Sequence, residues 1–65
     1  MVNLKSIRKS RGMTQNELAK AAKVSFLSIH RYETGERIPD VDIAARIAAA
    51  LGCTVDDLIQ KEEST

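Results

Sequence analysis

The chain has 65 residues, which is room for one domain that buries only about 60% of the surface exposed by its unfolded form. Its single cysteine, Cys53, excludes an internal disulfide, and one cysteine with one histidine falls short of a structural zinc site. Stability must therefore come from well-packed elements, from a second subunit, or from both. A lone thiol and no secretion signal are typical of a cytoplasmic protein, and the longest uncharged stretch, 47–55, is too short for a membrane span.

The net charge of +1 is the sum of a basic first part and an acidic second part of the chain. Residues 1–38 carry eight basic and three acidic side chains, a net charge of +5, whereas residues 39–65 carry two basic and six acidic ones, a net charge of −4. This asymmetry favours a basic surface that faces a polyanion and an acidic end that faces away from it. An ordinary solvated surface is the alternative.

Apolar residues recur at helical spacing along the chain, and no segment alternates with a period of two. The pattern predicts a first helix that Asn3 caps and that ends near Gly12. A second helix is predicted from Gln15 to about Ala22, because the segment Thr14–Glu17 has the spacing of a capping box.

Three further helices complete the expected domain. Ser25 is predicted to cap a third helix, which ends at Gly35. Asp40 is predicted to cap a fourth helix, which ends at Gly52, and a fifth helix follows Thr54. Residues 60–65 form a polar tail that we expect to be frayed. The sequence therefore predicts a single all-α domain of five helices over residues 1–65.

The most informative feature is the very short connection between the second and third predicted helices. Only Lys23 and Val24 separate the two helices from the cap at Ser25, so the helices must cross steeply and the third must project from the domain. Apolar or small residues stand where the pair would face inward, namely Leu18, Ala19, Ala22, Val24, Ile29 and Tyr32.

This segment resembles the helix-turn-helix of the phage repressor and Cro family (XRE-like regulators). The similarity continues through Glu33–Pro39 and Ala48–Leu58, and it covers the chain from Leu4 to Ile59. The resemblance implies a compact five-helix domain like that of the lambda repressor, with the helix-turn-helix at helices 2 and 3. It also implies a cytoplasmic, nucleoid-associated protein of a bacterium or phage.

The family places its third helix in the major groove of DNA, so the resemblance implies a role for each matching residue. The base-reading positions are Phe26, Leu27, His30 and Arg31. The phosphate-contacting positions are Thr14, Gln15, Ser25, Ser28, Thr34 and Arg37. An internal ion pair is implied between Arg8 and Glu33.

Phe26 and Leu27 are apolar where the family often has polar residues. Arg31 can bond O6 and N7 of guanine together, whereas Phe26 and Leu27 can contact thymine methyl groups. Side by side and exposed, these two residues can alternatively bind a protein. Lys23 stands where glycine is common, and a positive φ there would cost on the order of 1 kcal/mol.

The fifth predicted helix has two interpretations. Val55, Leu58 and Ile59 either close the small core or extend onto a two-fold interface, with Ile47 or Leu51 beside them. DNA half-sites one helical turn apart call for such symmetry, so we expect a homodimer.

These features predict sequence-specific binding of double-stranded DNA by a dimeric transcriptional regulator, a repressor on an inverted-repeat operator. No cofactor, metal, membrane or small-molecule substrate is expected. Control is expected from the protein's own concentration, from a regulatory protein partner or from proteolysis. No enzyme is expected, because the residue types of a hydrolytic triad, Ser28, His30 and Glu33, all stand on one short helix. The alternative is a protein-interaction module, or an antitoxin-like partner-binding protein, on the same fold.

Overall fold

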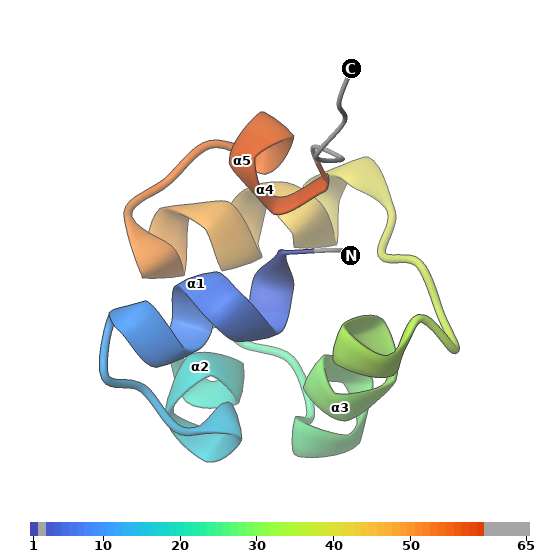
Figure 1. Cartoon of the computed structure of the whole chain (residues 1–65). Helices are drawn as coiled ribbons and strands as arrows, with labels where there is room; N and C mark the ends of the chain where they lie inside the picture. The colour runs from blue at the N-terminus through green and yellow to red at the C-terminus, as the bar shows by residue number, and fades with distance from the viewer. Residues whose placement is uncertain (2, 60–65) are drawn as a thin grey trace.

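The computed structural model describes residues 1 and 3–59 of the chain. Within that part it contains five α-helices, and the predicted all-α fold is confirmed (Figure 1). The helices are α1 (Leu4–Ser10), α2 (Gln15–Ala22), α3 (Phe26–Thr34), α4 (Val41–Leu51) and α5 (Val55–Ile59). The tail that we predicted to be frayed, 60–65, lies outside the described residues. None of the described helices combines the length and the hydropathy that a membrane span requires.

Local capping signals set the starts of the middle helices. The hydroxyl of Thr14 accepts a hydrogen bond from the Glu17 N–H at 3.1 Å, and the Glu17 carboxylate accepts one from the Thr14 N–H at 2.8 Å. Asp40 accepts a hydrogen bond from the Ile43 N–H at 2.9 Å in the same manner. These bonds satisfy N–H groups that have no partner within the first turn of a helix, so α2 and α4 begin where the sequence predicts.

The start of α1 differs from the prediction. Asn3 occupies the position before the helix, but its side chain makes no capping bond to α1. Its amide nitrogen donates instead to the carbonyl oxygen of Asp57 at 3.0 Å, and its backbone N–H donates to that of Leu58 at 3.0 Å. Because Asn3 has φ of −100° and ψ of 7° rather than an extended backbone, its side chain turns toward α5. Asn3 therefore joins the beginning of the domain to its last helix.

The core takes one large, fully buried side chain from each helix, in chain order Leu4, Leu18, Ile29, Ile47 and Leu58. α2 packs against both α3 and α4, α1 contacts α3 and α5, and α4 also contacts α5. Figure 1 shows α3 and α5 at opposite ends of this assembly, with α1 between them. The position of α3 therefore depends on the helices beneath it.

The burial of Leu58 is a correction to the predicted dimer interface. Its side chain is 0% exposed, and the neighbouring candidates Ile47 and Leu51 are also buried. These residues close the core and offer no surface to a second subunit. Of the three predicted interface residues, Val55 is half-buried and Ile59 is exposed.

Candidate nucleic-acid interface

The turn between α2 and α3 directs the third helix away from the domain. Lys23, which stands where glycine is common in the family, adopts the left-handed conformation, with φ of 61° and ψ of 45°. The Val24 N–H donates to the carbonyl oxygen of Ala19 at 3.0 Å, and the extended backbone of Ser25 then starts α3. The turn is closed within three residues. Ala19 is buried beneath it, where a small side chain allows the helices to approach.

The two sides of α3 have different surroundings. Ile29 is fully buried and Tyr32 is 7% exposed, so this side anchors the helix in the domain. Phe26 and Leu27 in the first turn are 47% and 49% exposed, and His30 is also exposed. Three of the four residues predicted to read bases therefore lie on the outer side of the helix.

Arg31, the fourth predicted base reader, lies near an acidic side chain that the sequence did not identify as its partner. Its Nε atom is 3.8 Å from a carboxylate oxygen of Glu36, and the two side chains are 37% and 63% exposed. Pairs this exposed contribute little to stability because water screens them. Glu36 can therefore hold the guanidinium near the end of α3 without preventing it from contacting another group.

The residues predicted to contact phosphates are grouped at the ends of α2 and α3. The Ser25 hydroxyl accepts a hydrogen bond from the Ser28 N–H at 3.1 Å and donates one to the Ser28 hydroxyl at 2.9 Å. The hydrogen of the Ser28 hydroxyl is thus directed away from this bonded pair. Thr34 donates to the carbonyl oxygen of Arg31 at 3.1 Å, whereas Arg37 is exposed after the helix. The N–H groups of a helix N-terminus favour an anion beside the starts of α2 and α3.

A buried network joins three helices behind this surface. Arg8 on α1 donates from Nε and Nη2 to the two carboxylate oxygens of Glu33 on α3, at 2.5 Å and 3.2 Å. Gln15 on α2 donates from its amide nitrogen to the same carboxylate at 2.9 Å. The Arg8 and Glu33 side chains are 8% and 3% exposed. The structure thus contains the implied ion pair, and it adds Gln15 as a partner that sequence reasoning had assigned only to phosphate.

The charge of Glu33 is maintained by this network. Burial alone would raise the pKa of Glu33, but hydrogen bonds from Arg8 and Gln15 and the positive charge of Arg8 lower the pKa below its ordinary value. The remaining nitrogen of Arg8, Nη1, donates to the carbonyl oxygen of Met13 at 2.7 Å. The network therefore also holds the loop that precedes α2.

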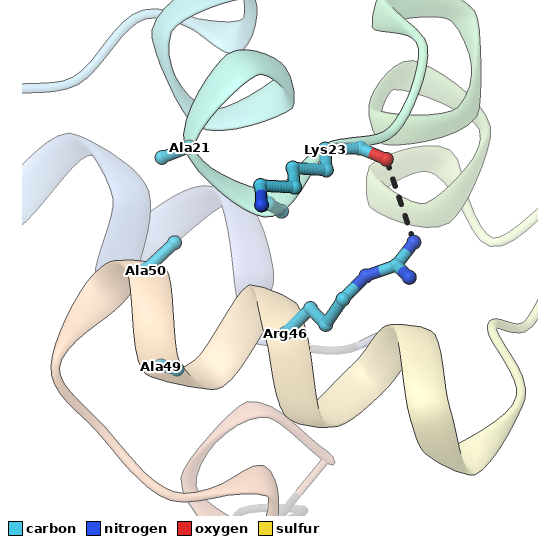
Figure 2. A pocket seen from close by; sticks show the side chains of 6 residues that line it. Ala21, Lys23, Arg46, Ala49 and Ala50 are labelled. Atoms are coloured by element: carbon cyan, nitrogen blue, oxygen red, sulfur yellow. Dashed lines mark hydrogen bonds between the residues drawn. The ribbon is translucent and has the colours of Figure 1, made fainter.

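Two other arginines have structural contacts that the sequence did not predict. Arg11 donates from Nε to the carbonyl oxygen of Leu51 at 2.8 Å, where it satisfies the end of α4. Arg46 on α4 donates to the carbonyl oxygen of Lys23 at 3.4 Å (Figure 2). This bond supports the turn between α2 and α3 from behind. The basic character of residues 1–38 is therefore partly structural, because Arg8 and Arg11 bond to acceptors within the domain itself.

Two hollows on the surface formed by residues 1 and 3–59 stand out, and no residue of α3 lines either of them. A shallow one of about 320 Å³ lies between α2 and α4, where four alanines line it beside the bonded pair of Lys23 and Arg46 (Figure 2). The other, of about 230 Å³, is an apolar groove, which we define by its lining residues Met1, Ile38, Pro39, Val41, Ala44, Val55 and Ile59. Sequence reasoning missed Ile38 and Val41, which are 85% and 84% exposed.

The helix-turn-helix family model matches residues 4–58 of the chain. The P22 c2 repressor protein, solved in complex with the synthetic operator 9T, is 28% identical with a TM-score of 0.82, over 88% of this chain and 86% of that one. The clp gene regulator ClgR from Corynebacterium glutamicum is 34% identical with a TM-score of 0.81, over 86% of this chain and 60% of that one.

A third similar structure is ComR from S. thermophilus, solved in complex with DNA and its signalling peptide ComS. It is 26% identical with a TM-score of 0.81, over 98% of this chain and 22% of that one. The chain thus spans most of the P22 c2 repressor chain but less than two thirds of the ClgR and ComR chains. None of the curated proteins matches the chain in sequence. The match over residues 4–58 and the fold of DNA-binding transcriptional regulators show that the chain belongs to the helix-turn-helix family of the phage repressor and Cro type.

Proposed function

We propose that this chain binds double-stranded DNA at specific sequences and represses transcription as a dimer on an inverted-repeat operator. The observation that carries the proposal is the exposed outer side of α3, which follows a tight turn and is anchored from behind by Ile29 and Tyr32. A helix held in this way can enter the major groove with the residues of its first turns toward the bases.

The charges around α3 support a polyanionic partner. From Leu18 to Tyr32 the chain has no acidic residue, whereas Lys20, Lys23 and Arg31 are basic. Phe26, Leu27, His30 and Arg31 are proposed to face the bases. The phosphate contacts are proposed for Thr14, Gln15, Ser25, Ser28, Thr34 and Arg37, of which Gln15 keeps one amide hydrogen beside its bond to Glu33.

The apolar groove supports a second copy of the chain as the other half of the dimer. Ile38, Val41 and Ile59 expose large apolar side chains around it, and the half-buried Val55 lines its wall. A single domain of this size buries little surface on DNA and binds weakly, whereas two copies across a two-fold axis contact both halves of an inverted repeat. Because the groove adjoins the segment that follows α3, pairing there would set the distance between two recognition helices.

The test is selection of bound duplexes from a randomised DNA pool at moderate salt, followed by sequencing. We expect an inverted repeat whose half-sites are about one helical turn apart. The Arg31→Ala variant should relax the preference at one base pair, at a cost of about 1–3 kcal/mol. Enrichment of a single half-site would contradict the dimer, and no enrichment by the folded protein would contradict DNA binding altogether.

Protein binding is a second candidate function, favoured by the exposure of Phe26 and Leu27 outside the core. ComR, one of the similar structures, was solved with a signalling peptide as well as with DNA. If α3 docks a protein, binding should depend on Phe26 and be indifferent to Arg31, and the selection should enrich no duplex.

A further inference from the structure

We propose that Phe26 and Leu27 read the methyl groups of thymine, so that each DNA half-site requires thymines at two neighbouring base pairs. This inference rests on the proposed function, because it names the chemical feature that the first turn of α3 recognises.

The two side chains lie outside the core of the domain. The core is built from other residues, and the partly buried apolar side chains that pack against it include neither Phe26 nor Leu27. α3 is already anchored by Ile29 and Tyr32. Two large apolar side chains that stay about half exposed in water therefore retain surface that a bound partner can cover.

The major groove offers one kind of apolar group in unmodified DNA, the C5 methyl group of thymine. The other groups along the base edges are hydrogen-bond donors and acceptors, which lose water without compensation when an apolar side chain covers them. Contact of Phe26 and Leu27 with thymine methyl groups therefore favours binding, whereas contact with the polar edges opposes it. Successive residues of a helix point about 100° apart, so the two side chains are directed toward different base pairs.

The surroundings of the pair fit DNA. Ser25 and Ser28 flank it in the sequence, and the bonded pair that their hydroxyl groups form leaves a hydrogen of Ser28 for a phosphate oxygen. The segment from Leu18 to Tyr32 lacks acidic side chains, so nothing there repels a phosphate backbone. The apolar pair is therefore framed by groups that suit a polyanion.

The experiment uses the full chain and the duplex enriched from the randomised pool. Each thymine of the half-site is replaced singly by uracil, which removes the methyl group and leaves the hydrogen-bonding edge unchanged. We expect about a fourfold loss of affinity at each of two neighbouring positions, since burial of one methyl group contributes about 0.8 kcal/mol. Uracil at thymines outside the contacted positions is the control and should change nothing. Cytosine at a sensitive position should weaken binding, and 5-methylcytosine should restore part of it.

Matched variants assign the effect to the two residues. Phe26→Leu keeps an apolar side chain and should keep the uracil effect, whereas Phe26→Gln should abolish it at one position only. Leu27→Met and Leu27→Gln should behave in the same way at the other position. Because both residues are about half exposed, all four variants should fold, which thermal melting verifies.

The outcomes separate this inference from the proposed function. If a duplex is enriched but uracil is tolerated everywhere, methyl recognition is refuted while sequence-specific binding stands. Uracil sensitivity that survives both glutamine variants would also refute it, because another residue would then be the reader. If no duplex is enriched by the folded chain, the proposed function itself fails.

Discussion

Glu33 accepts hydrogen bonds from two side chains on two different helices. Its carboxylate accepts from Arg8 on α1 and from Gln15 on α2, although its side chain is only 3% exposed. A buried charge is tolerated when hydrogen bonds and an opposite charge surround it, and removal of one partner leaves the other without compensation. This residue therefore couples the position of α3 to that of the two helices before it.

Substitution Glu33→Gln should lower the free energy of unfolding by about 3–5 kcal/mol, because it leaves the buried guanidinium of Arg8 unpaired. Urea unfolding at pH 7 measures this change. Glu36→Gln is the matched control, since the Glu36 side chain is 63% exposed and should change stability little. Equal losses in both variants would contradict the role of the buried network.

The pH dependence of stability follows from the lowered pKa of Glu33. In the unfolded chain the carboxyl group titrates near its ordinary value of 4.5, and in the folded chain it titrates below that. Its contribution is therefore fully present above pH 4.5 and is lost as the pH falls through the lower, folded value. Urea midpoints measured from pH 6 downward should show this loss in the parent chain and a smaller one in Glu33→Gln.

Single contacts could be anticipated from the sequence only in part. The pair of Arg8 and Glu33 was implied by the resemblance, and the guanidinium and the carboxylate are in contact in the structure. The bond from Gln15 to Glu33 was not anticipated, because the side-chain direction of a glutamine depends on a partner that the fold brings from another helix. The bond from Arg11 to the carbonyl oxygen of Leu51 was not predicted for the same reason, since the two residues are 40 positions apart.

The ends of the helices were more predictable where the capping bonds are local. The starts of α2, α3 and α4 each depend on a side chain that bonds an N–H three residues ahead, so a short segment contains the whole signal. The prediction that the Asn3 side chain caps α1 was wrong, because this side chain donates to an acceptor in α5 that lies far away in the sequence. Propensity and capping rules cannot report a contact made at that separation.

Lys23→Gly should raise the free energy of unfolding by about 0.5–1 kcal/mol. Relief of left-handed strain, about 1–2 kcal/mol, exceeds the extra entropy that glycine gives the unfolded chain, about 0.4–1 kcal/mol. Thermal melting should show an increase in Tm of roughly 4 °C for a domain of this size. Lys20→Gly is the control, because the same change inside α2 should lower stability by about 1 kcal/mol. A decrease in Tm for both variants would contradict strain at Lys23.

At the scale of the whole molecule, the outer side of α3 and the apolar groove are separate surfaces. The sequence predicted the first, because a short connection between two helices has few solutions. It did not predict the second, since Ile38 and Val41 differ in no local respect from residues that enter a core. Only the path of the chain from α3 into α4 leaves them 85% and 84% exposed.

Val41→Glu should weaken dimer formation without lowering the stability of the monomer. The side chain is exposed, and an acidic residue in the first turn of α4 suits the helix dipole. Across a two-fold axis, however, two such charges would repel each other. Sedimentation equilibrium and binding to an inverted repeat measure the effect, and the two half-sites should become independent. Ala45→Glu, exposed on α4 and absent from the groove lining, is the control. An unchanged self-association constant for Val41→Glu would contradict the proposed interface.

The core with one large side chain from each helix has a genetic consequence. Because Leu4, Leu18, Ile29, Ile47 and Leu58 meet in one place, truncation of any of them should weaken the same cooperative unit. Temperature-sensitive alleles of this regulator should therefore arise with similar ease in every helix, including those far from any bound DNA. A screen for conditional loss of function would then map the interior of the domain, whereas under the proposed function a screen for altered target choice would map the outer side of α3.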